Sequence, residues 1–392
     1  MVAEKLCLFL AIGVFLCLTQ VESYRVDITY LTSAVAKGAV CMDGSPPAYH
    51  FSPGFGNGSS NWLLLFEGGG WCNNATTCLI KRDGRLGSSK AMVKYKSFSG
   101  ILSNKASKNP DFYDWNKVRV RYCDGSSYTG DVEAVDPATK LHFRGNRIFH
   151  AMIQHFKTMG LSNAKNVLFA GCSAGGLGVI LQCDNFRNLM PPTINVKCLA
   201  DAGYFINAKT VAGTSQIEEI YADVVRTHNS AKVLPKYCTS KMSPGLCFFP
   251  ENVVAGIKTP LFILNAAYDS WQIKNILAPG VADPHGKWRN CKKNIKNCSS
   301  AQIGVMQSFR QNFLHALSKA GRPLSRGMFI NSCYAHCQAG VQSTWMDVGS
   351  PVLSGKTTIG KAVGDWYFDR DHFKAIDCPY PCDKSCHNRE FD

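Results

Sequence analysis

Short runs of apolar residues, each bounded by turn-forming residues, recur along the chain after residue 60. They occupy residues 62–66, 118–122, 167–170, 196–200, 261–265 and 327–330. Most of these runs lack polar alternation, which is typical of strands buried on both faces of a parallel sheet. Segments with helical spacing lie between several of them, at 145–159, 175–189 and 301–320. The alternation predicts an α/β fold with a mostly parallel central sheet flanked by helices.

Two of the helical segments have apolar residues on one side. These residues are Ile148, Met152, Ile153 and Phe156 in the first segment, and Val305, Phe309, Phe313 and Leu317 in the last. No internal repeat, low-complexity stretch or long linker divides the chain. We therefore predict that residues 24–392 form a single domain with long, disulfide-rich loops.

The first residues have a different pattern. Lys5 precedes an apolar run at 6–18 that is too short to span a bilayer, and the small residue Ser23 follows it. This pattern is typical of a secretory signal peptide, which we predict for residues 1–23. A retained membrane anchor is the alternative. After cleavage we expect a secreted chain without membrane attachment.

Cysteine usage agrees with export. Removal of Cys7 and Cys17 with the signal peptide leaves 16 of the 18 cysteines, an even number that suits pairing in an oxidising compartment. The spacings 72–78, 238–247 and 291–298 allow local loops, but spacing leaves the pairing open. The C-terminal cluster resembles a zinc finger in density, yet an oxidising compartment argues against it, and we predict no metal or cofactor. That cluster comprises Cys378, Cys382, Cys386 and His387.

Composition and charge narrow the class of partner. At 45% hydrophobic and 18% charged residues, the chain is neither disordered nor a coiled coil. Its 43 Lys and Arg against 28 Asp and Glu give a net charge of +15, which favours polyanionic partners. The basic residues are scattered, and the densest run, 287–296, spans a predicted disulfide loop, so nucleic acid is not expected. We expect an acidic polysaccharide as partner and a monomeric protein. Three sequons predict surface glycosylation at Asn57, Asn74 and Asn297.

The most informative motif is a serine between two glycines. Gly171-Cys-Ser-Ala-Gly175 directly follows the predicted strand 167–170 and precedes a helical segment. In this context Gly-x-Ser-x-Gly forms a nucleophile elbow, with Ser173 at the start of a helix and the N–H of Ala174 available to an oxyanion. The alternatives are a glycine-rich turn with an incidental serine and a dinucleotide-binding loop, whose glycine spacing does not match.

A serine nucleophile requires a base and an orienting acid, which follow it in the α/β-hydrolase order of acid and then histidine. Asp269 comes just after the strand 261–265, and we favour it over Asp201, which follows the strand 196–200. His336 follows the strand 327–330 between two cysteines and is the predicted base. His372 is the second choice.

The oxyanion requires further N–H donors, and a run of three glycines after the strand 62–66 supplies candidates. Such a glycine loop forms the oxyanion hole of lipases and esterases. We assign the N–H groups of Gly69 and Gly70, together with that of Ala174. A flexible glycine turn without this role is the alternative.

The chain resembles the plant pectin acetylesterase family, which also includes the animal Notum-type carboxylesterases. The resemblance covers the chain from about Thr29 to the C-terminal cysteines and rests on five strings in one order. They are Phe66-Glu-Gly-Gly-Gly-Trp-Cys72, Arg121-Tyr-Cys-Asp-Gly-Ser126, Gly171-Cys-Ser-Ala-Gly-Gly176, Ala267-Tyr-Asp-Ser-Trp-Gln272 and Asn331-Ser-Cys-Tyr-Ala-His-Cys337.

The resemblance implies an α/β-hydrolase-like fold and a triad of Ser173, Asp269 and His336. It also implies secretion to the cell wall and removal of acetyl groups from pectin galacturonan. The segment 121–130 follows a strand, so we expect Ser126 and Tyr128 to contact substrate, although a turn tied by Cys123 is an equal alternative.

Two other functions compete with this one. The first is a carboxylesterase that acts on lipid or acyl-protein esters, which requires a large apolar acyl pocket. The second is a non-catalytic polysaccharide-binding protein, in which aromatic side chains stack on sugars. Trp71 and Trp271 are candidate substrate contacts in either the catalytic or the binding case, and Trp345 is a further one for binding alone.

Overall fold

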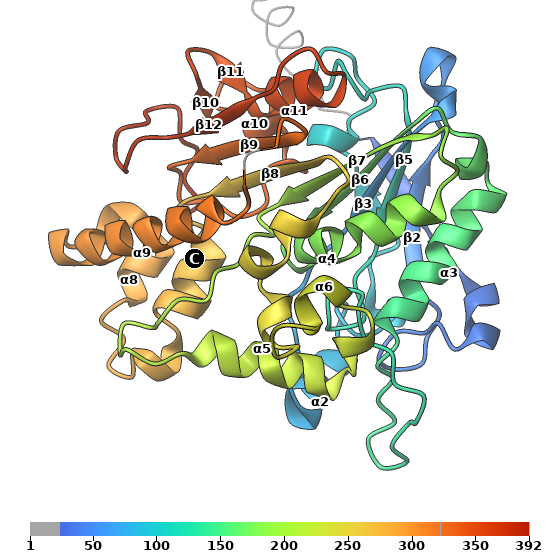
Figure 1. Ribbon diagram of the computed structural model, residues 1–392, viewed down its shortest axis with the longest axis horizontal. Coiled ribbons are helices and arrows are strands. Elements are labelled where there is room, and N and C mark those ends of the chain that lie inside the picture. The colour runs from blue at the N-terminus through green and yellow to red at the C-terminus, as the bar shows by residue number, and fades with distance from the viewer. Residues whose placement is uncertain (1–23, 322, 392) are drawn as a thin grey trace, which may run out of the picture.

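The structure is a computed structural model that describes residues 24–321 and 323–391. The predicted signal peptide, residues 1–23, lies outside the described residues. Ten strands form one sheet in the order β12-β9-β8-β7-β6-β3-β5-β2-β1-β4 (Figure 1). The strands are β1 Arg25–Tyr30, β2 Ala48–Ser52, β3 Asn61–Phe66, β4 Tyr95–Ser97, β5 Asn116–Val120, β6 Asn166–Cys172, β7 Asn195–Asp201, β8 Leu261–Ala266, β9 Arg326–Asn331 and β12 Lys374–Ile376.

The strands from β12 to β5 pair in parallel, whereas β2, β1 and β4 extend the sheet antiparallel. This arrangement confirms the predicted α/β, mostly parallel sheet. All six predicted strands are present, with the second two residues earlier than expected, at Asn116–Val120. The antiparallel extension was not predicted, because β1 and β2 contain polar residues.

Helices flank the sheet. In Figure 1 the helix α4 lies in front of the central strands, and α3 lies at the right, beside β2. A second sheet of two strands pairs β10 Val352–Leu353 with β11 Thr357–Thr358. The α-helices are α2 Ala75–Arg82, α3 Gly145–Thr158, α4 Ala174–Leu189, α5 Gln216–Thr227, α6 Lys236–Thr239, α7 Ser270–Gln272, α8 Arg289–Lys293, α9 Ser300–Ser318, α10 Gln342–Trp345 and α11 Ile359–Tyr367.

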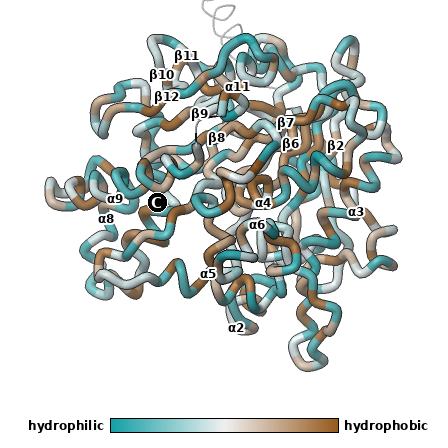
Figure 2. The backbone as a smooth tube through the Cα atoms, viewed as in Figure 1, coloured by the Kyte–Doolittle hydropathy of each residue, from teal (hydrophilic) through white to brown (hydrophobic). Residues whose placement is uncertain are grey.

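The buried strands contribute side chains to a core on each face of the sheet. In β3, Leu64 packs into the larger core with α3 and α4, while Leu63 and Leu65 pack into the core beneath α11. This alternation follows from the two-residue period of a strand. Figure 2 shows hydrophobic residues concentrated in the central strands and α4. Both faces are covered, as expected for a parallel sheet.

The predicted apolar face of the helix at 301–320 is wrong at one residue. Val305 of α9 is 39% exposed, and the buried face of this helix begins at Met306 instead. Phe309, Phe313 and Leu317 are buried as predicted.

Among the described residues, no helix combines the length and apolar character needed to cross a membrane.

Disulfides join the loops. Eight are formed among the described residues, including the three pairs that sequence spacing allowed. The C-terminal cysteines also pair, so their sulfurs are not available as zinc ligands. The pairs are Cys41–Cys123, Cys72–Cys78, Cys172–Cys337, Cys183–Cys198, Cys238–Cys247, Cys291–Cys298, Cys333–Cys386 and Cys378–Cys382.

The three sequon asparagines, Asn57, Asn74 and Asn297, are exposed. Asn74 also caps α2, where its side-chain oxygen accepts a hydrogen bond from the N–H of Thr77 at 2.9 Å. Glycosylation at these positions remains a prediction.

Candidate active site

Ser173 occupies the sharp turn between β6 and α4. Its backbone lies at φ +58° and ψ −128°, a conformation that a non-glycine residue rarely adopts. The two flanking glycines make this turn possible. A Cβ at Gly171 would collide with the carbonyl of Gly175, and a Cβ at Gly175 would collide with the carbonyl of Phe66. The turn therefore has the geometry of a nucleophile elbow.

His336 and Asp269 come together from two neighbouring strands. Asp269 follows β8, His336 follows β9, and His336 Nδ1 lies 2.8 Å from Asp269 Oδ2. The Asp269 carboxylate is 1% exposed, and its other oxygen accepts the N–H of Gln272 at 2.9 Å. A buried carboxylate on Nδ1 selects the tautomer in which Nε2 is free to accept a proton.

Ser173 and His336 line the same cavity. Within the part of the chain that the structure describes, no hydrogen bond joins Ser173 Oγ to the His336 ring. Catalytic hydrogen bonds are commonly long in substrate-free sites and shorten when substrate binds.

A disulfide joins the Ser173 loop directly to the His336 loop. Cys172, immediately before Ser173, pairs with Cys337, immediately after His336, with 5.6 Å between the two Cα atoms. The sequence placed cysteines beside His336 but gave no pairing for them. The bond spans 165 residues of chain and restrains the distance between the serine and histidine loops.

Asp201, the alternative acid, lies at the end of β7 between the two loops. Its carboxylate accepts the N–H groups of Gln338 at 3.1 Å and Ala339 at 2.7 Å, and its carbonyl accepts the N–H of Ser173 at 2.9 Å. Burial raises the pKa of Asp201 to about 6, against the lowering effect of these two N–H groups. Asp201 therefore holds the loop after His336, whereas Asp269 contacts the imidazole.

The glycine loop after β3 faces the serine. Gly69 and Gly70 line the cavity, and Gly70 has φ +66°. In the described residues, the N–H groups of Gly69 and Gly70 donate to no protein acceptor. Ala174 is the first residue of α4, where N–H groups have no partner within the helix. These N–H groups are the donors that an oxyanion at Ser173 requires.

Two side chains donate hydrogen bonds to the carbonyls of the same glycine loop. Lys81 Nζ donates to the carbonyl of Gly69 at 2.6 Å, and the hydroxyl of Tyr122 donates to the carbonyl of Gly70 at 2.8 Å. Because a peptide is planar, fixing its carbonyl also fixes the direction of the next N–H. Sequence motifs did not indicate Lys81 or Tyr122 for this role.

Beside the loop, Glu67 is held by two arginines. Its carboxylate lies 2.6 Å from Arg119 Nε and 2.8 Å from Arg121 Nε. Burial alone would raise the pKa of Glu67, but the two guanidinium groups outweigh it and hold the pKa below its usual value. Sequence analysis did not indicate this pair, although arginine alternates with apolar residues in 118–122 and could have suggested it.

The cavity has a volume of about 660 Å³. It adjoins a second hollow of about 710 Å³, with which it shares His336, Cys337, Val341 and Arg389. The two hollows therefore lie next to each other, with His336 in their common wall. The charged residues that line the first cavity are Glu67, Arg85, Lys96, Arg119, Lys274 and Arg389.

Of the four predicted substrate contacts, only Trp271 lines the cavity. Trp71 is half-buried, and its Nε1 donates to Ser127 Oγ at 2.8 Å. Ser126 and Tyr128 are 0% and 1% exposed, with hydrogen bonds to Asp124 Oδ2 and to the carbonyl of Glu67. They lie beneath the glycine loop and do not line the cavity. We therefore do not include a contact between these two residues and the substrate in the proposed function.

Aromatic rings fill the space beside the glycine loop. Trp71 packs edge-on against Phe205, Tyr221 and Trp271, with ring centroids 4.9, 5.0 and 5.4 Å apart. Trp271 also stacks on the His336 ring, with centroids 6.4 Å apart. Of these rings, those of Trp271 and His336 line the cavity.

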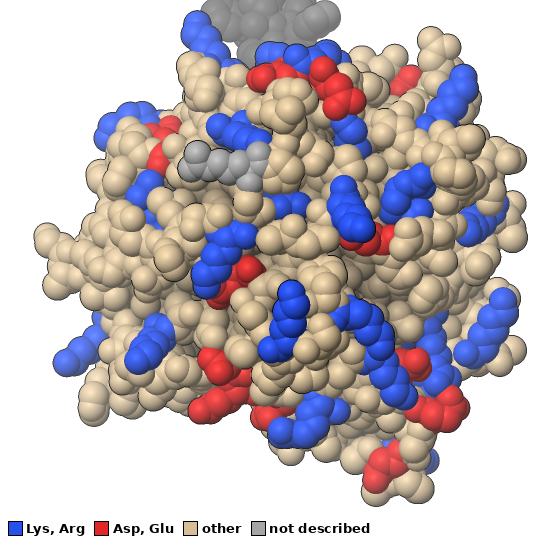
Figure 3. Space-filling view, in the orientation of Figure 1, with Lys and Arg blue, Asp and Glu red and all other residues tan. Residues whose placement is uncertain are grey.

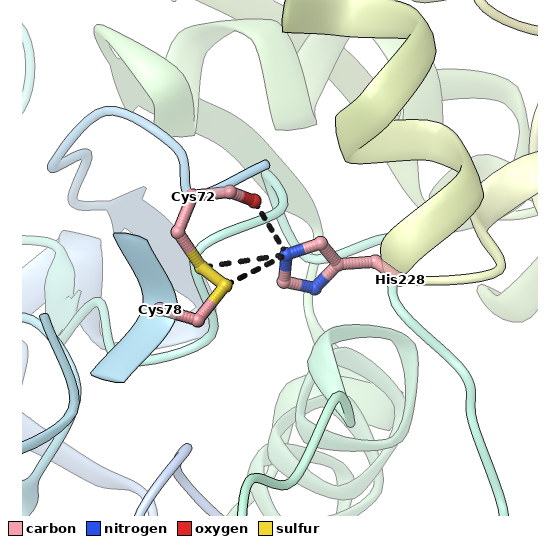
Figure 4. Close-up of side chains that lie close together, drawn as sticks. All are labelled: Cys72, Cys78 and His228. Atoms are coloured by element: carbon pink, nitrogen blue, oxygen red, sulfur yellow. Dashed lines mark hydrogen bonds between the residues drawn. A yellow bond between two sulfur atoms is a disulfide. The ribbon is translucent and has the colours of Figure 1, made fainter. Parts of the chain in front are cut away.

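The disulfide Cys72–Cys78 closes the segment that follows Trp71, and His228 points toward it (Figure 4). His228 Nε2 donates to the carbonyl of Cys72 at 2.9 Å, and burial lowers the pKa of this histidine to about 4. The three residues lie close enough to suggest metal ligands. Both sulfurs are in the disulfide, however, so this donor set lacks the thiolates that a metal would need.

A family model described as Pectinacetylesterase matches residues 19–387. The chain belongs to the pectinacetylesterase family. Pectin acetylesterase 7 of Arabidopsis thaliana is 53% identical over 362 residues, which cover 92% of each chain. Pectin acetylesterase 11 of the same plant is 51% identical over 372 residues, 95% of each chain. The family membership and the site together identify a carboxylic ester hydrolase.

A more distant relative is the palmitoleoyl-protein carboxylesterase NOTUM of Mus musculus. It is 28% identical over 396 residues, which cover 93% of this chain and 72% of the mouse protein. The predicted resemblance to both groups is thus confirmed, with the plant pectinacetylesterases much more similar in sequence.

Proposed function

We propose that the protein is a secreted serine esterase that hydrolyses acetyl esters of cell-wall pectin. The observation that carries this proposal is the convergence of Ser173, His336 and the Gly69–Gly70 loop on one cavity, whose charged lining residues are predominantly cationic. The similarity to plant proteins named pectin acetylesterase supports the substrate. The predicted signal peptide, which lies outside the described residues, supports secretion to the cell wall.

In the proposed reaction, His336 Nε2 takes the proton of Ser173 Oγ while Oγ bonds to the acetyl carbonyl carbon. The carbonyl electron pair moves to oxygen, which the N–H groups of Gly70 and Ala174 stabilise. The bond to the sugar oxygen then breaks, and that oxygen receives the proton from His336. Water, deprotonated by His336, attacks the acetyl-serine and releases acetate and the serine hydroxyl. Asp269 keeps the imidazole oriented throughout.

The acyl group favoured by the site is small. The rings of Trp71, Phe205 and Trp271 pack against one another beside the glycine loop, where a long acyl chain would need an open apolar channel. The relation to NOTUM keeps a lipid or acyl-protein ester as the competing substrate. A non-catalytic polysaccharide-binding protein would have no use for the strained serine or the Asp269–His336 contact.

A series of p-nitrophenyl esters from acetate to palmitate tests the acyl preference. We expect kcat/KM to be highest for acetate and to fall by about tenfold or more at octanoate, since a longer chain meets the packed rings. Hydrolysis of palmitate or octanoate in preference to acetate would favour the lipid-ester function. The Ser173→Ala variant, measured beside it, gives the background for every ester.

A further inference from the structure

The cleft around Ser173 has an unbalanced charge. Five cationic side chains line it, but Glu67, the one carboxylate in its lining among residues 24–321 and 323–391, is already bound by Arg119 and Arg121. Among the described residues, no carboxylate forms an ion pair with the four other cations. These are Arg85, Lys96, Lys274 and Arg389.

Two of these cations lie on the β3 side of Ser173. Arg85 follows α2 and is exposed, and Lys96 belongs to β4 and is half-buried. Burial lowers the pKa of Lys96, Glu67 raises it, and Arg119, Arg121 and Arg85 lower it further. The electrostatic coupling of Lys96 to three arginines shows that this part of the cleft concentrates positive charge, which an anion would relieve.

The other two cations lie on the β8 side. Lys274 follows α7, and Arg389 is held near the end of the described chain, where its N–H donates to the carbonyl of Tyr334 at 2.7 Å. Both pack on the ring of Phe391, with Lys274 Nζ 5.4 Å and Arg389 Cζ 4.9 Å from its centroid. Arg389 also borders the adjoining hollow.

The sheet order sets Lys96 and Lys274 on opposite sides of the nucleophile, and each has one of the two arginines near it, Arg85 and Arg389 respectively. Ser173 follows β6, which lies between β3 and β7; β5 and β4 are beyond β3, and β8 is beyond β7. A ligand that contacts both pairs must therefore pass over Ser173. A single small ester cannot do so, whereas a polymer with one carboxylate on each sugar can.

This inference rests on the proposed function. We propose that four cations bind the carboxylates of the galacturonate units that flank the acetylated unit. Arg85 and Lys96 bind on one side, and Lys274 and Arg389 bind on the other. The enzyme would then recognise runs of unesterified galacturonate and act within the polymer. Methyl esterification of the flanking carboxylates would remove this recognition.

The test compares acetate release from acetylated polygalacturonate with free carboxylates and from the same polymer after methyl esterification. The variants are Arg85→Gln with Lys96→Gln, and Lys274→Gln with Arg389→Gln. The control is Lys105→Gln with Lys232→Gln, two exposed lysines that line neither hollow. Thermal unfolding checks that each variant folds. The four cleft side chains are exposed or half-buried, so their truncation should leave Tm nearly unchanged.

We expect wild-type kcat/KM to favour the free polymer. Each cleft variant should lower the ratio of free to methylated activity by about tenfold, mainly through KM, and the control should keep the wild-type ratio. A ratio that stays at the wild-type value in both cleft variants would overturn the inference while leaving the esterase intact. Absence of acetate release from both polymers by the wild type would instead overturn the proposed function, and this inference with it.

Discussion

Asp269 and Asp201 are both buried carboxylates near His336, and their contacts separate their roles. Asp269 lies 2.8 Å from the His336 ring, while Asp201 binds the backbone of Gln338 and Ala339. The sequence left both open as the orienting acid, because each follows a buried strand. Only the path of the loop after β9 determines which carboxylate reaches the imidazole, and strand patterns do not contain that information.

Asp269→Asn should lower kcat by about 10⁴-fold, because an amide can present an N–H to Nδ1 and stabilise the unproductive tautomer. KM for a small ester should change much less. Steady-state kinetics on p-nitrophenyl acetate measures both, and circular dichroism checks the fold. A fall in kcat of less than about tenfold would remove Asp269 from the triad.

Asp201 should make stability depend on pH. Burial raises its folded-state pKa to about 6, above the usual value of 3.8. The folded protein therefore binds this proton more tightly than the unfolded chain does. Its contribution to the free energy of unfolding is complete below about pH 4 and is lost as the pH rises through about 6.

We expect the wild type to lose Tm relative to Asp201→Asn as the pH is raised from 4 to 7, whatever the offset between the two proteins at pH 4. Differential scanning calorimetry across this range measures the difference. Parallel curves for the two proteins would show that Asp201 titrates with an unshifted pKa.

Lys81 acts on the oxyanion donors through the peptide of Gly69. Its ammonium binds the Gly69 carbonyl at 2.6 Å, which orients the N–H of Gly70 toward the cavity. Lys81→Met should lower kcat by about tenfold and change KM little, since the lost contact matters most when the oxyanion forms. Lys105→Met, at an exposed position outside the cavity, is the control. Equal kcat in the two variants would contradict this positioning role.

At the scale of helices and strands, sequence patterns predict the elements that depend only on residues close together in the chain. Each of the six predicted strands is a short apolar run, and the glycines around Ser173 are required by the turn itself. The antiparallel strands β1 and β2 escape prediction because they are partly polar, and β4 because it is also only 3 residues long. His50 of β2, for example, is fully buried in a strand that pattern alone would place at the surface.

The residues of the site likewise divide into those that the sequence predicts and those that it does not. Ser173, Asp269, His336 and the glycine loop follow strand ends, so their order in sequence indicates their proximity. Ser126 and Tyr128 also follow a strand, but the segment folds under the glycine loop, where both side chains are buried. The bond between Cys172 and Cys337 was likewise not predictable, because 16 cysteines allow very many pairings and spacing favours only the local ones.

The Cys172–Cys337 disulfide should matter for catalysis more than for folding. Replacing both cysteines by alanine frees the serine and histidine loops to move apart, and we expect kcat to fall by about tenfold or more at a temperature where the protein remains folded. The matched control replaces Cys378 and Cys382, an exposed pair only 4 residues apart in sequence. Equal kcat in the two double variants would show that the bond has no role in positioning.

At the scale of the whole molecule, charge is spread widely. Figure 3 shows Lys and Arg scattered over one face with acidic residues among them, in agreement with the sequence and without the continuous stripe of a nucleic-acid groove. The net charge of +15 nevertheless attracts a polyanion from all directions. In the proposed function, local recognition in the cleft and general attraction by the surface act together on an acidic polymer.

Salt should separate polymer binding from chemistry. Raising the ionic strength from 0.1 M to 1 M shortens the screening length from about 10 Å to about 3 Å. KM for acetylated polygalacturonate should rise steeply over this range, while kcat/KM for p-nitrophenyl acetate should change little. Acetate release measured in both series makes the comparison, and a polymer KM indifferent to salt would remove the electrostatic argument.

The central claim is that Ser173 removes acetyl groups from pectin. The most direct test is acetate release from acetylated pectin and from acetylated xylan by the wild type and by Ser173→Ala. We predict release from pectin, little from xylan, and a loss of at least about 10⁴-fold in the variant with its fold intact. Release from neither polymer, or an equally active and correctly folded Ser173→Ala, would contradict the claim.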